Sequence, residues 1–193
     1  MLVEMAEPTD TTVPYPLLAE ERPFTVDDLD GMPDDGRRYE LVDGMLFVSA
    51  APGWLHQRAV LRLSVPLDQA CTAGFEVLTA PFAVQFGART QLQPDLLVTE
   101  SRHFSVRGLY VPPLLAVEVL SESTRMYDRH TKRLVFQRAG TPSYWLVDPS
   151  RPSLTALELD AGSYVQVANV EGAQSWTAVR PYAVTVVPAD LLR

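Results

Sequence analysis

Apolar and polar positions alternate along the chain in a way that predicts a mixed α/β (α+β) fold. Short apolar or alternating runs bounded by Gly, Pro or Asp are typical of β-strands. They lie at residues 37–49, 75–86, 91–100, 114–120, 143–149, 153–159, 163–168 and 183–187. Helical spacing predicts a short helix after Phe24 with Thr25 as its N-cap, and longer helices over 56–72 and 125–139. This order favours a mixed β-sheet flanked by helices, with a β-hairpin region near the N-terminus.

Two of these segments carry further local detail. The pair Asp43-Gly44 lies between apolar residues, which is the strongest short-range indication of a tight hairpin turn. The helix over 56–72 has an apolar stripe formed by Leu55, Ala59, Leu63 and Leu67. Pro66 interrupts it and predicts a kink or a break, because proline lacks the backbone N–H of a helix interior.

Glu118 is the most informative residue of the chain. It interrupts the apolar run 114–120, which is typical of a central strand buried on both faces. Burying an unpaired carboxylate costs several kcal/mol, so a cation, a hydrogen-bond network or an open sheet edge must compensate. Asp95 follows Pro94 and begins the preceding predicted strand. If these strands pair about 4.8 Å apart, the two carboxylates can hold one hard divalent ion such as Mg²⁺.

Lys132 is the single lysine among 16 basic side chains. It lies in the predicted helix over 125–139, where Asp128, Lys132 and Phe136 share one face. A lysine over the carboxylates would stabilise phosphate charge or orient an activated water. The alternative is a solvent-exposed pair with Asp128 that has no chemical role.

Several motifs in order along the chain resemble the Uma2 family of endonucleases, within the PD-(D/E)XK restriction-endonuclease-like superfamily. The resemblance covers nearly the whole chain, from about residue 24 to 192. Its motifs are YELVDG (39–44), a helix opened by His56, QPD (93–95), VEVLSEST (117–124), D-x-x-x-K (128–132) and GTPSYWLVDP (140–149).

The resemblance implies a restriction-endonuclease-like fold and a site made from these motifs. Asp95 corresponds to the motif aspartate and Glu118 to the motif acid, and both would hold Mg²⁺ or Mn²⁺. The motif lysine normally lies two residues after the acid, where this chain has Leu120. In Uma2-like sequences the lysine is displaced to the following helix, which identifies Lys132. Glu40 would complete the metal shell and His56 would face the site.

Each of these assignments has a simpler alternative. Asp95 could form a turn, Glu118 a buried ion pair with an arginine, Glu40 a strand-surface carboxylate and His56 a surface position at the helix start. Arg125, Arg129, Lys132, Arg133 and Arg138 form either a phosphate-facing surface or a solvated helix face. Three residues of the segment 143–149 are expected to be structural, namely Tyr144 and Trp145 in the core and Asp148 in a turn.

Charge and composition indicate how the chain is divided into domains and in which cellular compartment it is expected. The net charge is −8, yet residues 1–43 carry 12 of the 24 acidic and three of the 16 basic side chains. Residues 1–22 are predicted to be a flexible acidic leader and residues 23–193 a single nuclease-like domain. One cysteine excludes an intramolecular disulfide, and no apolar stretch predicts a signal peptide or a membrane span. These features favour a cytoplasmic protein.

The leading functional hypothesis is a metal-dependent endonuclease that hydrolyses DNA phosphodiester bonds. Its cofactor would be Mg²⁺ or Mn²⁺, its substrate DNA and, by analogy with nucleases of this size, its assembly a homodimer. The alternative is a non-catalytic nuclease-fold protein that binds a nucleic acid or a protein partner, which the acidic leader suits better. An unrelated small-molecule hydrolase lacks support, because the chain has no nucleophile elbow.

Overall fold

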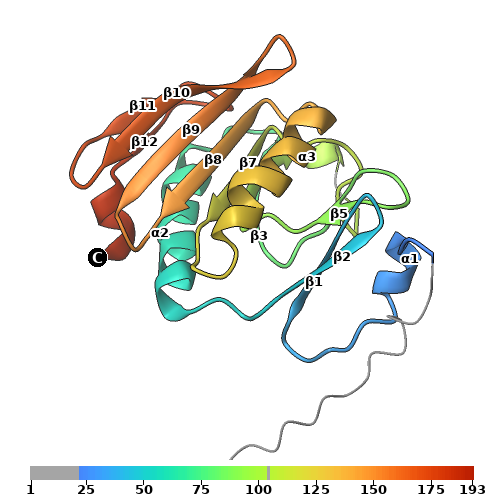
Figure 1. The fold of residues 1–193 in the computed structure, drawn as a ribbon. Helices are drawn as coiled ribbons and strands as arrows, with labels where there is room; N and C mark the ends of the chain where they lie inside the picture. The colour runs from blue at the N-terminus through green and yellow to red at the C-terminus, as the bar shows by residue number, and fades with distance from the viewer. Residues whose placement is uncertain (1–21, 104) are drawn as a thin grey trace, which may run out of the picture.

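The protein is built around a six-stranded mixed sheet. The computed structural model describes residues 22–103 and 105–193. The strand order of the six-stranded sheet is β10-β9-β8-β7-β6-β3. A second, four-stranded sheet has the order β2-β1-β5-β4, and β11 and β12 form a separate pair (Figure 1). The predicted leader lies outside the described residues except for Arg22. None of the helices in the described ranges is long and apolar enough to cross a membrane.

The elements follow the predicted order closely. The helical segments are α1 (Val26–Leu29), α2 (Trp54–Ala70), η2 (Ser101–His103), the π-helix η3 (Tyr127–Lys132), α3 (Arg133–Ala139) and η4 (Pro188–Leu192). The strands up to the middle of the large sheet are β1 (Arg38–Val42), β2 (Met45–Ser49), β3 (Phe75–Thr79), β4 (Val84–Gln85), β5 (Gln91–Leu92), β6 (Leu96–Glu100) and β7 (Leu115–Val119). The remaining strands are β8 (Ser143–Asp148), β9 (Ser153–Asp160), β10 (Ser163–Glu171), β11 (Trp176–Ala178) and β12 (Val184–Val186).

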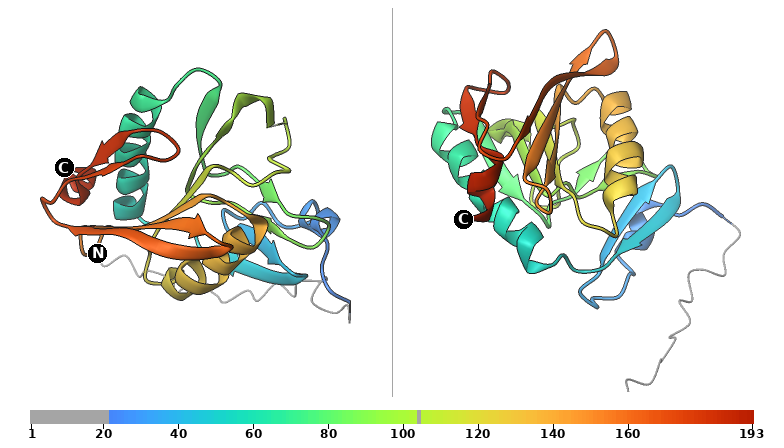
Figure 2. Two further views of the ribbon diagram at one scale, coloured as in Figure 1. Left: turned by 90° about the horizontal axis from the view of Figure 1, so that it is seen from above. Right: turned by 60° about the vertical axis from the view of Figure 1, so that its left-hand side comes forward.

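Helices cover both faces of the large sheet, which produces two apolar cores (Figure 2). On one face, Ala59, Leu63 and Leu67 of α2 pack against the sheet residues Leu115, Val117 and Trp145. On the opposite face, Val135 and Phe136 of α3 pack against Ala116, Leu120 and Tyr144. Because side chains alternate along a strand, Glu118 of β7 points to the α3 side of the sheet.

β7 and β8 form the parallel pair of the sheet, and the helical segment over 125–139 provides the crossover between them. A parallel pair requires such a crossover and is normally covered on both faces. All five residues of β7 are buried, so the predicted central strand is confirmed. The aromatic residues Tyr144 and Trp145 of β8 are buried in opposite cores, as expected.

The β1–β2 hairpin has the predicted turn. Asp43 and Gly44 both have positive φ angles, 51° and 87°, which is the geometry that joins two strands through a two-residue mirror-image turn. Leu41 of β1 pairs with Gln91 of β5, so the hairpin is anchored beside the segment that leads to Asp95.

Some boundaries differ from the sequence expectation. Helix α2 continues through Pro66, so the predicted break is wrong. The lost hydrogen bond would have used the carbonyl of Arg62, an exposed residue at which water can replace it. The segment over 91–100 contains two strands, and Asp95 lies in the link between them. The strand Trp176–Ala178 was not predicted.

Candidate active site

A small cavity of about 70 Å³ lies where the hairpin, β7 and the π-helix meet. Four charged residues proposed from the sequence line it: Glu40, Asp95, Glu118 and Lys132. They come from β1, the link before β6, β7 and the π-helix. His56, from the first turn of α2, lines it too. The structure therefore brings together all five residues selected from the sequence.

Lys132 is the centre of the charge network. Its side chain is only 2% exposed. Its Nζ atom lies 3.0 Å from Glu40 Oε1 and 3.2 Å from Glu118 Oε2. Asp128 Oδ1 lies 3.7 Å away. The exposed Lys132–Asp128 pair considered above is therefore wrong, since one buried ammonium group is shared by three carboxylates.

Glu118 is fully buried, with 0% exposure, and its two oxygens differ. Oε2 accepts a hydrogen bond from Lys132, whereas Oε1 has no hydrogen-bond partner among the described residues. A buried carboxylate oxygen without a donor is costly. Glu118 lines the cavity, so a ligand bound there is one way to satisfy this oxygen.

Glu40 and Asp95 are both buried rather than on the surface or in an exposed turn. Glu40 Oε1 accepts a hydrogen bond from the Gln93 backbone N–H at 2.7 Å. Asp95 Oδ2 accepts one from the Val119 backbone N–H at 2.8 Å and lies 3.0 Å from His56 Nε2. These bonds fix both carboxylates relative to β7.

Arg38 completes the shell around Asp95. Its Nη1 atom donates to Asp95 Oδ1 at 2.9 Å and to the Gln93 carbonyl at 3.2 Å. Sequence reasoning did not select it. A usable indication existed, because Arg38 lies two residues before Glu40 on the same strand, and residues at this spacing share a strand face.

The local electrostatics follow from burial and from unequal numbers of acids and bases. Burial alone would raise the pKa of Asp95, but the hydrogen bond from His56 and the charges of Lys132 and Arg38 hold it well below its usual range. Burial raises the pKa of Glu118 well above its usual value, and Lys132 opposes this only in part. Burial raises the pKa of Asp128 to about 6, and the positive charge of Lys132 again opposes this increase.

Lys132 keeps its proton despite full burial. Burial would lower its pKa, but the surrounding carboxylates, Glu118 first and then Glu40 and Asp128, raise it well above its usual value. Tyr127 stands over the same group, with Lys132 Nζ 5.4 Å from the ring centroid. Burial also raises the pKa of Tyr127, so its phenol is neutral.

The donor set is suited to a hard divalent ion bound mainly by water. Within residues 22–103 and 105–193, no three His, Cys, Asp or Glu side chains converge as a complete metal site. Mg²⁺ commonly uses one or two carboxylates and keeps several waters. Asp95 and Glu118 are the two residues of this cavity that could hold such an ion, and both Asp95 oxygens already have hydrogen-bond partners, from Arg38, His56 and Val119.

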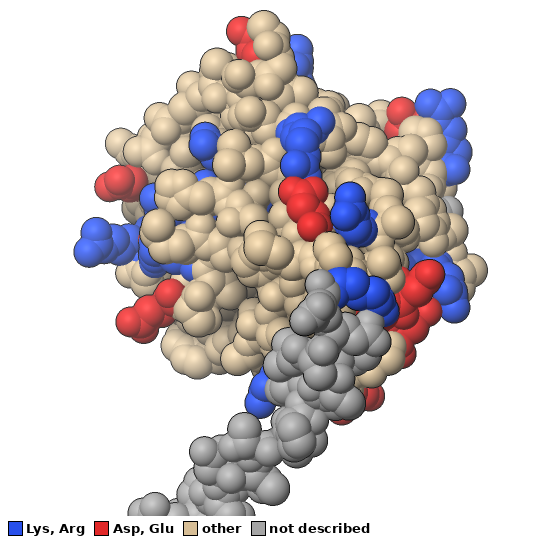
Figure 3. All heavy atoms as spheres, turned by 45° about the vertical axis from the view of Figure 1, so that its right-hand side comes forward, with Lys and Arg blue, Asp and Glu red and all other residues tan. Residues whose placement is uncertain are grey.

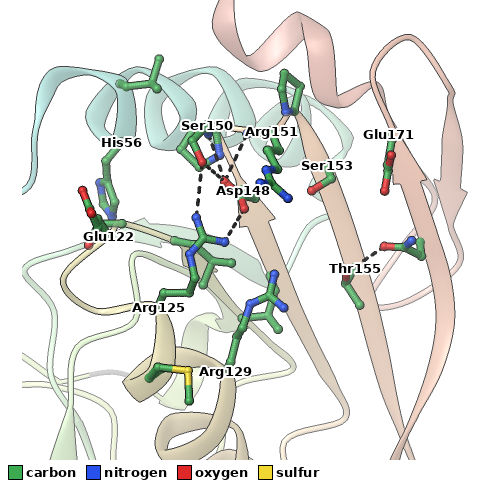
Figure 4. A pocket seen from close by; sticks show the side chains of 18 of the residues that line it. His56, Glu122, Arg125, Arg129, Asp148, Ser150, Arg151, Ser153, Thr155 and Glu171 are labelled. Atoms are coloured by element: carbon green, nitrogen blue, oxygen red, sulfur yellow. Dashed lines mark hydrogen bonds and ion pairs between the residues drawn. The ribbon is translucent and has the colours of Figure 1, made fainter.

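A larger hollow of about 1370 Å³ adjoins the cavity and shares Gly53, His56 and Ser121 with it. Figure 4 shows Arg125 reaching to Asp148 and Ser150 at the end of β8. Three arginines and three acids line the hollow: Arg125, Arg129, Arg151, Glu122, Asp148 and Glu171. It is therefore polar but not strongly basic.

The predicted basic helix face is divided in the structure. Lys132 points inward, while Arg125 and Arg138 form ion pairs with Asp148 and Asp43. Acidic and basic side chains are also interspersed on the face shown in Figure 3. Any phosphate contacts from this surface therefore depend on individual arginines, because the visible charges do not form a single positive field.

Comparisons with known proteins agree with this architecture. The model of the Uma2 family, described as "Putative restriction endonuclease", matches residues 26–186. A crystal structure described as "a putative nuclease belonging to DUF820 from Anabaena variabilis ATCC 29413" superposes with a TM-score of 0.72 at 16% identity. The superposition covers 88% of this chain and 98% of that one. A search of curated proteins found no match.

Proposed function

Because the chain belongs to the Uma2 family, we propose that it is a divalent-metal-dependent endonuclease that hydrolyses DNA phosphodiester bonds at the cavity described above. The observation that carries this proposal is the fully buried Glu118, which has one unpartnered oxygen and lines a cavity together with Asp95 and Lys132. A chain that only needed a stable core would gain nothing from this arrangement, since an apolar residue would avoid the cost of burial.

Asp95 and Glu118 are the proposed ligands for Mg²⁺ or Mn²⁺. An ion held there would polarise the phosphate and lower the pKa of a water molecule. Asp95 is suited to this role because it remains ionised, and Glu118 offers a free oxygen. Glu40 would help to hold bound water, since it lines the same cavity.

Lys132 and His56 have supporting roles in the proposal. The Lys132 ammonium group, buried and protonated, would stabilise negative charge that develops on the phosphate. It would also hold Glu40 and Glu118 close together, since its Nζ atom contacts both carboxylates. His56 holds Asp95 through Nε2, while its Nδ1 atom has no partner among the described residues.

The test combines metal binding with DNA cleavage. Mn²⁺ titrations by calorimetry should detect binding by the unmodified chain and a loss of at least about tenfold in Asp95→Asn and Glu118→Gln, as expected when one carboxylate ligand is removed. Glu158→Gln is the matched control, because Glu158 is on β9 and pairs with Arg180. Cleavage of single- and double-stranded DNA with Mg²⁺ or Mn²⁺ should be lost in the same two variants.

The opposite result has a clear meaning. If the folded, unmodified chain binds no Mn²⁺ and cleaves no DNA, the metal-dependent nuclease proposal is wrong. The non-catalytic alternative would then be tested by DNA binding in the absence of metal.

The proposal extends to the oligomeric state and the cellular location of the protein. We propose a homodimer, because two copies would present two sites to the two strands of DNA, and a cytoplasmic location, where such DNA is accessible. Sedimentation with and without duplex DNA tests the first proposal, and cell fractionation tests the second.

A further inference from the structure

The Tyr127 hydroxyl is one of three buried polar atoms without a partner among the described residues of this cavity, together with Glu118 Oε1 and His56 Nδ1. Tyr127 lines the cavity beside Glu118 and Lys132. Its hydroxyl, like Glu118 Oε1, is buried and has no hydrogen-bond partner among the described residues. The phenol is a hydrogen-bond donor and the carboxylate an acceptor, and both residues line this cavity. A ligand bound in the cavity is one way to satisfy them.

The ring of Tyr127 is held firmly in place. It stacks on Phe47 of the hairpin, with ring centroids 4.4 Å apart and an interplanar angle of 23°. Lys132 Nζ lies over the ring, 5.4 Å from its centroid. These contacts involve the ring and not the hydroxyl, so they explain the presence of an aromatic residue but not of a tyrosine.

The cavity that Tyr127 lines has room for a small ligand. Its volume of about 70 Å³ exceeds the roughly 10–15 Å³ that one water molecule needs. Tyr127 also begins the π-helix, a form that occurs often at functional sites. The other end of that helix carries Lys132, so a single irregular turn presents both side chains to the cavity.

We propose that the Tyr127 hydroxyl is a ligand-binding group of this cavity, which donates a hydrogen bond to an oxygen atom of the phosphodiester or of its attacking water. This role rests on the proposed nuclease function. A hydrogen bond to a charged oxygen corresponds to roughly a 10- to 100-fold effect. A purely structural role for the hydroxyl would predict no such effect.

The test is Tyr127→Phe, which keeps the ring and removes only the hydroxyl. The melting temperature should stay unchanged or rise, because the group removed has no partner. Tyr182→Phe is the matched control, since the Tyr182 hydroxyl donates to the Leu67 carbonyl at 2.8 Å in the other core. This control should lower the melting temperature and leave cleavage within about twofold.

With a cleaving wild type, Tyr127→Phe should reduce single-turnover cleavage about tenfold or more. Weaker duplex binding would identify a phosphate oxygen as the acceptor, and a lower rate with unchanged binding would identify the water. Cleavage equal to wild type would overturn the inference while leaving the nuclease function intact.

If the wild type does not cleave, the nuclease proposal fails separately, and calorimetry with inorganic phosphate and Mg²⁺ decides the inference. Binding by wild type that weakens about tenfold in Tyr127→Phe supports a ligand-binding hydroxyl. Equal binding by both proteins, or no binding by wild type, overturns it.

Discussion

Lys132→Met tests whether the buried network requires a cation. Methionine retains the apolar length of the side chain but removes the ammonium group from between three carboxylates, at 3.0, 3.2 and 3.7 Å. Removing one partner from a buried ion pair typically costs about 3–5 kcal/mol, because the remaining charge is left uncompensated. Arg38 is the other cation nearby, and it is directed at Asp95.

The expected loss is therefore about 3–5 kcal/mol of unfolding free energy. For a chain of this size, each kcal/mol corresponds to roughly 2–4 °C in melting temperature. Urea denaturation monitored by circular dichroism measures the free energy, and thermal unfolding provides an independent check. Arg138→Met is the control, since the exposed Arg138–Asp43 pair should contribute less than about 1 kcal/mol.

A double-mutant cycle with Glu118→Gln separates charge from packing. Neutralising Glu118 in the Lys132→Met background should recover part of the loss, with a coupling of about 1–3 kcal/mol. The electrostatic reasoning would be refuted if Lys132→Met cost no more than Arg138→Met, or if the cycle gave no coupling. The double variant also provides a measurement if the single variant is too unstable to purify.

Three further predictions concern other parts of the structure. Burial raises the pKa of the Asp128 carboxyl from 3.8, its value without the fold, to about 6 in the folded protein. The stabilisation that this group contributes to the folded state should therefore be greatest below about pH 4. It should fall by up to about 3 kcal/mol as the pH rises through 6. Urea titrations across this range should show a flatter dependence in Asp128→Asn, and an unchanged slope would contradict the assignment. Gly44→Ala should be more destabilising than Gly162→Ala. Both glycines have positive φ, but only the Cβ added at Gly44 would meet another atom, Pro23 Cβ at 2.6 Å. Equal losses in unfolding free energy would argue against this close approach. Tyr144→Phe should lose about 0.5–1.5 kcal/mol, because the hydroxyl donates to the Asp128 carbonyl at 2.8 Å; chemical denaturation showing no loss would contradict that bond.

The sequence predicts the fold well where local chemistry and periodicity agree. The hairpin turn at Asp43-Gly44 and the central strand around Glu118 depend on a few adjacent residues, and both are present. The α2 break at Pro66 was a wrong prediction because it considered proline in isolation. Packing of the stripe on both sides of Pro66, with Leu63 and Leu67 fully buried, outweighs one missing hydrogen bond.

The residues that meet in the candidate site could be selected from sequence, but most of their interactions could not. A carboxylate in an apolar strand indicated a compensating cation, a hydrogen-bond network or an open sheet edge, and the structure shows a cation, Lys132, beside it. Which other charges would join depended on long-range register. Arg38 reaches Asp95 across 57 positions of sequence, and Tyr127 meets Phe47 only because the π-helix lies over the hairpin. No local pattern specifies such contacts, since they arise from the packing of separate elements.

The geometry is compatible with the prediction that the motif lysine is displaced to Lys132. The position two residues after Glu118 is Leu120, which lies on the α3 side of the sheet like Glu118 and is buried in that core. A lysine there would have to replace an apolar side chain of the core. The π-helix crosses the same side and brings Lys132 Nζ to within 3.2 Å of Glu118 Oε2. The π-helix thus supplies a positive charge on the side of the sheet that Leu120 also faces, and the side chain at position 120 can remain apolar and support the core.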